Sequence, residues 1–177
     1  MINNDAKSNW GHRDNILYRW HQKVNLGLAY DKKRLAMVQQ FEGDYVDYLQ
    51  PPDLSGNILS LSGQIKLGVL NNISICYDKY PLAISPNDLI MGNYHSYGLG
   101  DRLGYIISPP PAGQFYKNLP DEAIQAREWN TGPSGQFSIQ ADISPVLVNG
   151  KGVYTIVFIV KVNSEAINLT NYSIFVS

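Results

Sequence analysis

The run from Gly152 to Val162 constrains the fold more than any other part of the sequence. Its residues are almost all β-branched or aromatic, and Lys161 is the one charged residue among them. Such side chains favour extended backbone, and a run without polar alternation requires burial on both faces of a sheet. The sequence therefore predicts a central strand over 153–162.

Similar short apolar segments recur after Pro51-Pro52, separated by turns rich in Gly and Pro. Strands are predicted over 57–65, 72–77, 103–107, 137–143 and 169–176. This spacing favours an immunoglobulin-like or jelly-roll-like β-sandwich over residues 51–177, so that the chain is mainly β. Two connections stand out: 121–128 is predicted to form one or two helical turns, and the proline-rich 109–113 a stiff loop.

The first fifty residues have a different organisation. A short helix is predicted over 14–20, with Ser8 or Asn9 as its N-terminal cap. Alternating apolar residues over 23–30 predict a strand, which pairs as a hairpin with a second strand over 35–48. One helix and one hairpin cannot enclose a core, so residues 1–50 need a further surface to pack against.

Composition excludes several classes of protein. Of the 177 residues, 44% are hydrophobic and 16% charged, the latter well below the roughly 25% of soluble domains, so the chain has the material for a sizeable core. The net charge of −1 and the lack of a basic stripe argue against nucleic acid as a partner. The sequence contains no run of eighteen apolar residues, so it does not predict a membrane-spanning helix. Cys76 stands alone, which excludes an intrachain disulfide and a thiolate metal cluster and favours a buried, inert thiol.

Three motifs follow one another near the N-terminus: Gly11-His12-Arg13-Asp14-Asn15-Ile16-Leu17, Val24-Asn25-Leu26-Gly27-Leu28-Ala29 and Val38-Gln39-Gln40-Phe41. They resemble the Gly-His-Arg-x-Asn-Ile-Leu helix, the Val-Gly-Ile-Gly strand and the Thr-Gln-Val-Phe strand of prokaryotic CAP-superfamily (cysteine-rich secretory protein-like) domains. The resemblance covers about residues 10–48. It implies that residues 1–50 are the C-terminal fragment of a CAP α-β-α domain, joined to the sandwich of 51–177. The residues that match the family motif, with structural roles implied, are Gly11, His12, Arg13, Asn15, Gln39 and Phe41.

The departures from the family matter as well. The earlier family helices have no counterpart here, so the chain is expected to be part of a longer protein or the product of a misplaced start codon. Without those helices, Leu26, Leu28, Met37 and Phe41 should lie partly uncovered. The family's two-His, two-Glu cleft cannot be assembled, because its strand His falls near Ala36. We therefore expect no metal, no cofactor and no enzyme activity. The Pro-rich loop and closing strand of the second part also resemble the β domains that some CAP proteins carry.

No catalytic group is evident in the sequence. His12, His21 and His95 are dispersed, without the spacings that zinc sites require. His12 is expected to pack under the hairpin, and His21, in a polar stretch, to be solvated. The serines lie in no Gly-x-Ser-x-Gly turn, and Cys76 has no base near it in sequence.

Three asparagines, Asn72, Asn168 and Asn171, begin N-glycosylation sequons. With the scarcity of cysteine, these features favour a prokaryotic, extracellular or cell-surface CAP-like protein whose β domain mediates adhesion, with a cell-surface protein or glycan as its partner. A carbohydrate-binding module is the alternative, since aromatic side chains such as Trp129 stack on sugars. A CAP-type hydrolase ranks third.

Overall fold

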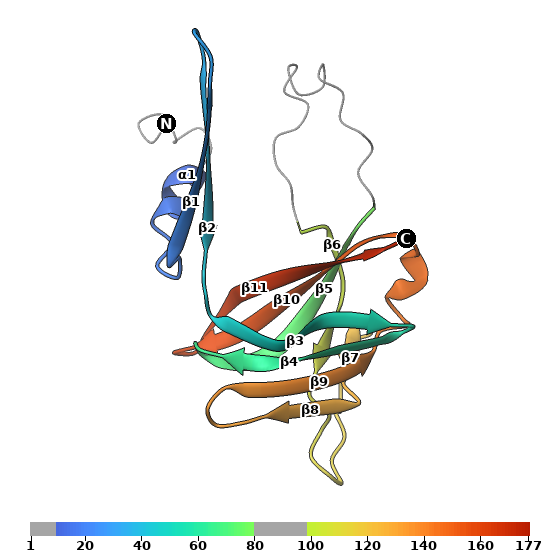
Figure 1. The fold of residues 1–177 in the computed structure, drawn as a ribbon. Coiled ribbons are helices and arrows are strands. Elements are labelled where there is room, and N and C mark those ends of the chain that lie inside the picture. The colour runs from blue at the N-terminus through green and yellow to red at the C-terminus, as the bar shows by residue number, and fades with distance from the viewer. Residues whose placement is uncertain (1–9, 80–98) are drawn as a thin grey trace. The chain divides into compact units, whose positions relative to one another are not determined.

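The computed structural model describes residues 10–79 and 99–177, apart from the side chain of His12 (Figure 1). The chain divides into two compact units, residues 1–44 and 45–177. The first unit contains helix α1 (Gly11–Ile16) and strands β1 (Lys23–Tyr30) and β2 (Leu35–Glu42). His95 lies outside the described residues.

The second unit contains two sheets. The five-stranded sheet has the order β11-β10-β5-β6-β7 and is made of β5 (Val69–Asp78), β6 (Asp101–Ile107), β7 (Ala123–Gln125), β10 (Gly152–Val162) and β11 (Glu165–Val176). The four-stranded sheet has the order β3-β4-β9-β8 and is made of β3 (Val46–Ser55), β4 (Ile58–Ile65), β8 (Glu128–Thr131) and β9 (Gln136–Asp142). Neighbouring strands are antiparallel except for β6 and β7, which are parallel. A short 3₁₀ helix, η2 (Leu147–Asn149), precedes β10.

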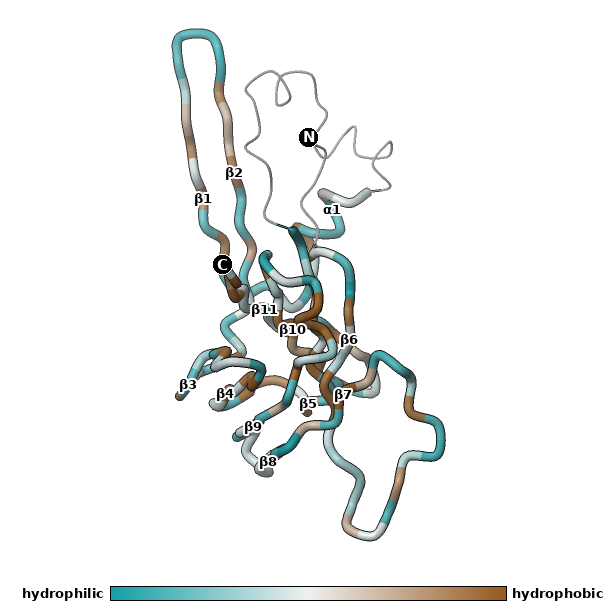
Figure 2. The backbone as a smooth tube through the Cα atoms, turned by 90° about the vertical axis from the view of Figure 1, so that its right-hand side faces the viewer, coloured by the Kyte–Doolittle hydropathy of each residue, from teal (hydrophilic) through white to brown (hydrophobic). Residues whose placement is uncertain are grey.

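The two sheets pack together in a sandwich-like arrangement around one core. The Phe137 ring of β9 meets the Phe158 ring of β10 edge to face, with 5.6 Å between their centroids. Tyr154, Ile156 and Phe158, at alternate positions of β10, are fully buried. Burying each such side chain stabilises the fold by roughly 1.5–3 kcal/mol. Figure 2 shows hydrophobic residues concentrated along β10.

The prediction of a central strand over 153–162 is confirmed, because β10 pairs with β11 on one side and β5 on the other. The chain is mainly β, as the composition indicated. The strands predicted over 57–65, 72–77, 103–107, 137–143 and 169–176 correspond to β4, β5, β6, β9 and β11. The helical turns predicted over 121–128 are wrong, because that segment forms β7 and the start of β8.

Pro51-Pro52 does not separate the two units. Both prolines lie within β3, and the division falls between Asp44 and Tyr45. β3 is an edge strand, where a missing N–H donor leaves no partner unsatisfied, and its register against β4 shifts between Gln50 and Asp53. The two prolines interrupt the alternating sequence pattern, but the strand continues through them.

The first unit is a two-stranded hairpin with a short helix. The helix predicted over 14–20 is wrong in position: α1 spans Gly11–Ile16, and its N-cap is Trp10, in the left-handed region at φ 61°, without a side-chain capping bond. The predicted caps, Ser8 and Asn9, lie outside the described residues. The first strand is confirmed at Lys23–Tyr30, whereas the second ends at Glu42 rather than at residue 48. We call residues 23–42 the arm.

Every residue of β1 is exposed, and so are all but the last two of β2. The strands pair without a register shift, from Lys23 with Glu42 to Tyr30 with Leu35. The arm therefore has complete backbone pairing, and among the described residues of the first unit no second layer covers most of its length.

Candidate binding surface

The outer face of the four-stranded sheet is an array of amides and hydroxyls. In β4 and β9, apolar side chains point into the core at every second position, and polar side chains occupy the alternate positions. The register aligns Ser60 with Gln140, Ser62 with Ser138 and Gln64 with Gln136. Asn130 of β8 continues the middle row. Residues directly opposite one another share a sheet face, so these seven side chains form one surface.

Charges lie at the margins of this surface. Asp142 and Arg127 form an ion pair at 2.5 Å, and Lys66 pairs with Asp47 at 2.7 Å. The pKa of Asp142 is lowered. The larger cause is the hydrogen bond that the Ser144 amide donates to the Asp142 carboxylate at 3.1 Å, and the neighbouring Arg127 adds to it. On the two central strands, β4 and β9, the rows carry neutral donors and acceptors suited to neutral polar ligands, whereas Asp53 and Glu128 continue one row onto the edge strands.

A hollow of about 490 Å³ adjoins these rows at the β8–β9 end of the sheet. Two residues of the edge strand β8 line it: Asn130 from the outer face, opposite Ser138, and the half-buried Trp129 from the core-facing side, opposite Ile139. Gln136 and Ser138, of the outer polar face, line it too. The hollow is thus lined both by Trp129, from the core-facing side of β8, and by three side chains of the outer face that donate and accept hydrogen bonds.

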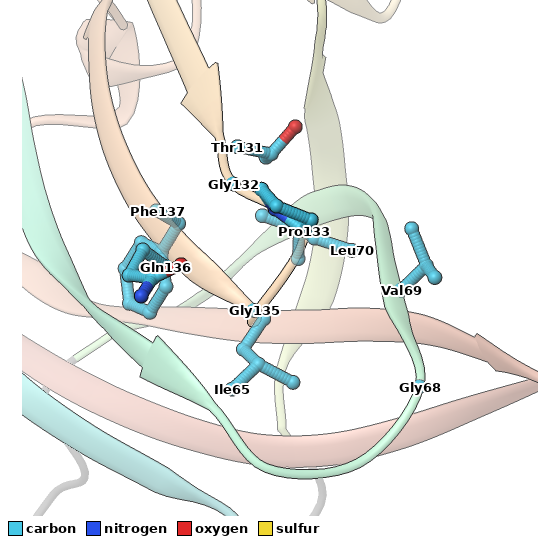
Figure 3. Close-up of a pocket in the computed structure, with 10 residues that line it drawn as sticks. All are labelled: Ile65, Gly68, Val69, Leu70, Thr131, Gly132, Pro133, Gly135, Gln136 and Phe137. Atoms are coloured by element: carbon cyan, nitrogen blue, oxygen red, sulfur yellow. The ribbon is translucent and has the colours of Figure 1, made fainter.

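A smaller hollow, of about 250 Å³, lies next to the first, between the β4–β5 and β8–β9 turns (Figure 3). It shares four lining residues with the larger hollow: Thr131, Gly132, Gln136 and Phe137. Val69 and Leu70 of the five-stranded sheet complete its apolar wall. The two hollows therefore adjoin across these residues, and we call the pair the depression.

Gly135 fixes the rim of this depression. Its φ is +83°, and a Cβ at this position would lie 2.1 Å from the Ile65 carbonyl oxygen. The Gly135 carbonyl accepts a hydrogen bond from the Ile65 amide at 2.9 Å, which joins the β8–β9 turn to the end of β4. Only glycine permits this approach with a positive φ. The depression is consequently built on a constrained turn.

A third hollow, of about 590 Å³, lies on the five-stranded sheet. Asn72, Ser74 and Arg102 line it, together with Glu122 from the connection that precedes β7. The Ser74 hydroxyl donates a long hydrogen bond of 3.5 Å to the Asn72 side-chain oxygen. Asn72 is half-buried here, while Asn168 and Asn171 are exposed on the edge strand β11. Of the three sequons, the two on β11 are thus the more accessible.

The residues of the family-like motif lie on two elements of the first unit. Gly11, His12, Arg13 and Asn15 lie on α1, whereas Gln39 and Phe41 lie on β2. Arg13 forms an ion pair with Asp14 at 2.7 Å and lies 4.7 Å from the centre of the Trp10 ring. These contacts are local to the helix.

His21 differs from the sequence prediction. Its ring is half-buried and stacks on Phe41, with 5.0 Å between the ring centroids, and it meets the Tyr18 ring edge to face. The segment that follows α1 therefore contacts Phe41 through His21, and the prediction of a solvated His21 is wrong.

The titratable groups of the sandwich include one free cysteine. Cys76 is buried, and its burial raises the pKa of the thiol, so little thiolate forms at neutral pH. Among the described residues, no group of three or more His, Cys, Asp or Glu side chains is arranged to hold a metal ion. Within the same ranges, no helix has the length and apolarity needed to cross a membrane.

Comparisons of this chain with protein families, with curated proteins and with solved structures find no match. The assignment of a function therefore rests on the surface itself.

Sequence patterns contained a signal for part of this surface. The alternation Gln136-Phe137-Ser138-Ile139-Gln140 predicted a strand, and its polar positions form the outer rows. The sequence predicts Trp129 as a residue that could stack on sugars, and Trp129 lines the hollow. The pairing that brings Ser62 of β4 beside Ser138 had no signal in the sequence, because it joins segments 76 positions apart.

Proposed function

We propose that this protein is a non-catalytic interaction protein, acting outside the cell, whose β-sandwich binds carbohydrate through the outer face of its four-stranded sheet and the depression beside it. The observation that carries the proposal is the continuity between the neutral amide and hydroxyl rows and the hollow lined by Trp129. This combines an adhesion role with the carbohydrate-binding alternative. The finer assignment of the second unit as immunoglobulin-like or jelly-roll-like belongs to the same proposal.

The chemistry of the surface supports a glycan as ligand. Sugars present hydroxyls that both donate and accept, and the amides of Asn130 and Gln136 offer two donors and an acceptor each. An indole such as that of Trp129 supplies an apolar ring face for the C–H side of a pyranose. The hollow of about 490 Å³ falls in the range of about 300–1,000 Å³ typical of small-molecule sites.

A non-catalytic role is supported by the state of Cys76, whose raised pKa makes it a poor nucleophile. The CAP-like character of residues 10–48 is part of the proposal, supported by the order of a helix and two strands in this segment. The exposed sequons at Asn168 and Asn171 are consistent with a location outside the cell.

The proposal is tested with a glycan array, followed by calorimetric titration of the ligands found. Gln136→Ala removes a hydrogen-bonding group from the hollow and should weaken binding about tenfold, the equivalent of one net hydrogen bond. Trp129→Ala should weaken it at least as much. Gln125→Ala serves as the matched control, because Gln125 is an exposed strand glutamine that lines none of the three hollows. Its affinity should match the wild type.

Two results separate the function from the site. Failure of the wild-type protein to bind any glycan, while it binds a protein ligand, would contradict the carbohydrate assignment. Glycan binding that Gln136→Ala and Trp129→Ala leave unchanged would keep the function and move the site elsewhere.

A further inference from the structure

One face of the arm is almost entirely apolar and uncharged. Because paired residues share a face, the register places Val24 with Phe41, Leu26 with Gln39, Leu28 with Met37 and Tyr30 with Leu35 on the same side. We call these eight residues the apolar arm face. Gln39 is its one polar member, and the opposite face carries Lys23, Asn25, Gln40 and Glu42.

Most of the apolar arm face is open to solvent. Six of its side chains are between 45% and 83% exposed: Val24, Leu26, Leu28, Tyr30, Leu35 and Met37. At roughly 100 Å² each, they present on the order of 600–700 Å² of surface, at or above the largest patch of a typical monomer. At the base of the arm, the His21 ring stacks on Phe41, which is half-buried.

We propose that this face binds the same face of a second copy of the chain, with the two arms antiparallel. Two such faces would bury about 1,200–1,400 Å², which reaches the range of specific interfaces. Symmetry makes this contact self-complementary, since a two-fold axis across the arms matches one surface with itself. The area available on one arm is thus what a dimer of arms needs.

The antiparallel arrangement matches large side chains with small ones. A two-fold axis across the middle of the face exchanges the first and fourth rows and the second and third rows. Val24 of one copy then meets Tyr30 of the other, and Leu26 meets Leu28. Gln39 meets the flexible Met37, which leaves its amide near the margin of the face, within reach of water.

Charge at the two ends of the arm favours the antiparallel over the parallel orientation. The turn at the tip holds Asp31, Lys32, Lys33 and Arg34, a net charge of +2 from three cations and one anion. The base holds Lys23, Glu42 and Asp44, a net charge of −1, in which Lys23 pairs with Asp44 at 2.7 Å. Antiparallel arms bring each tip to the opposite base, whereas parallel arms would bring two cationic tips together.

Sedimentation velocity over a range of protein concentrations tests the proposal. The wild-type chain should form a dimer, and Leu28→Lys should raise its dissociation constant at least about a hundredfold, because each dimer loses two buried leucines. Val38→Lys is the matched control: Val38 is 67% exposed against 64% for Leu28, but it lies on the opposite face. Its dissociation constant should stay within a few-fold of the wild-type value. Leu26→Ser, which adds no charge, should weaken the dimer in the same direction as Leu28→Lys.

The orientation has its own test in mixed oxidation of two single-cysteine proteins. In a Cys76→Ser background, Leu26→Cys mixed with Leu28→Cys should give a disulfide-linked heterodimer in excess over either homodimer, since the antiparallel arrangement places these positions opposite one another. A wild-type chain that stays monomeric at high concentration would overturn the proposal. The apolar arm face would then be covered by residues of the same chain or by another protein. Equal weakening by Val38→Lys and Leu28→Lys would overturn it too.

Discussion

The arm and the sandwich are built from strands with the same alternating pattern, yet they differ completely in burial. In β9, Phe137, Ile139 and Ala141 point inward and are buried. In β1, Val24, Leu26 and Leu28 alternate in the same way and remain exposed. The difference is the second layer: the five-stranded sheet covers β9, whereas most of the arm has only its own hairpin partner. Alternation thus predicts a strand and its faces, and a second layer determines whether the apolar face is buried.

This comparison predicts its largest effect in the core. Phe158→Ala removes a fully buried ring that packs against Phe137 and Tyr48, and should lower the free energy of unfolding by about 3–5 kcal/mol. Leu26→Ala in the arm should change it by less than about 0.5 kcal/mol in the dilute chain, because Leu26 is already exposed. Urea unfolding of both variants, followed by tryptophan fluorescence, measures the contrast. Comparable losses would mean that the arm is buried as the sandwich is.

A smaller loss is expected at the rim of the depression. Gly135→Ala places a Cβ against the Ile65 carbonyl at positive φ, and should destabilise the sandwich by about 2 kcal/mol or more. Gly113→Ala, at φ +80° in a loop with open space around it, should lose only about 1 kcal/mol. Thermal unfolding separates the two variants. If both shift the midpoint equally, the contact between the β8–β9 turn and β4 contributes nothing beyond backbone conformation.

The smallest effect appears only at alkaline pH, inside the sandwich. Burial raises the pKa of Tyr48 to about 12, where its ring lies between Phe158 and Tyr172. A phenol with a raised folded-state pKa contributes stability that is fully present below pH 10 and is lost as the pH rises from about 10 to 12. Urea unfolding at several pH values should therefore show a steeper alkaline loss in the wild type than in Tyr48→Phe.

Part of the alkaline slope should remain in Tyr48→Phe. Burial also raises the pKa of Tyr154, whose hydroxyl donates to the Gly150 carbonyl at 2.9 Å. Tyr154→Phe in the Tyr48→Phe background should flatten the curve further. Identical alkaline slopes in the wild type and both variants would show that neither phenol is buried as described.

The strong strands of the sandwich could be predicted from the sequence, and the weak ones could not. The β-branched and aromatic composition of β10 predicts a strand. β7 has only three residues and depends on parallel pairing with β6, which local sequence does not reveal. Local propensity over 121–128 favoured a helical turn, and tertiary pairing overrode it. β3 escaped prediction because two prolines interrupt its pattern, and its edge position tolerates them.

The candidate surface was predictable only in fragments, for a similar reason. Polar positions on β9 and the aromatic Trp129 are local features of the sequence. Their assembly with Ser62 and Gln64 of β4 depends on long-range register, which a single sequence does not specify. His21 illustrates the converse error, because its polar neighbours in sequence suggested solvent while the stacking on Phe41 arises from the hairpin.

The central claim, that the sandwich is self-sufficient and the arm is completed by a second surface, is tested most directly by amide hydrogen exchange at two protein concentrations. In the dilute chain, β10 amides should be strongly protected while β1 and β2 amides exchange rapidly, because the arm lacks a covering layer. At high concentration the arm amides should slow by at least tenfold, and β10 should change little. Arm amides as protected as those of β10 in the dilute, monomeric chain would contradict the claim.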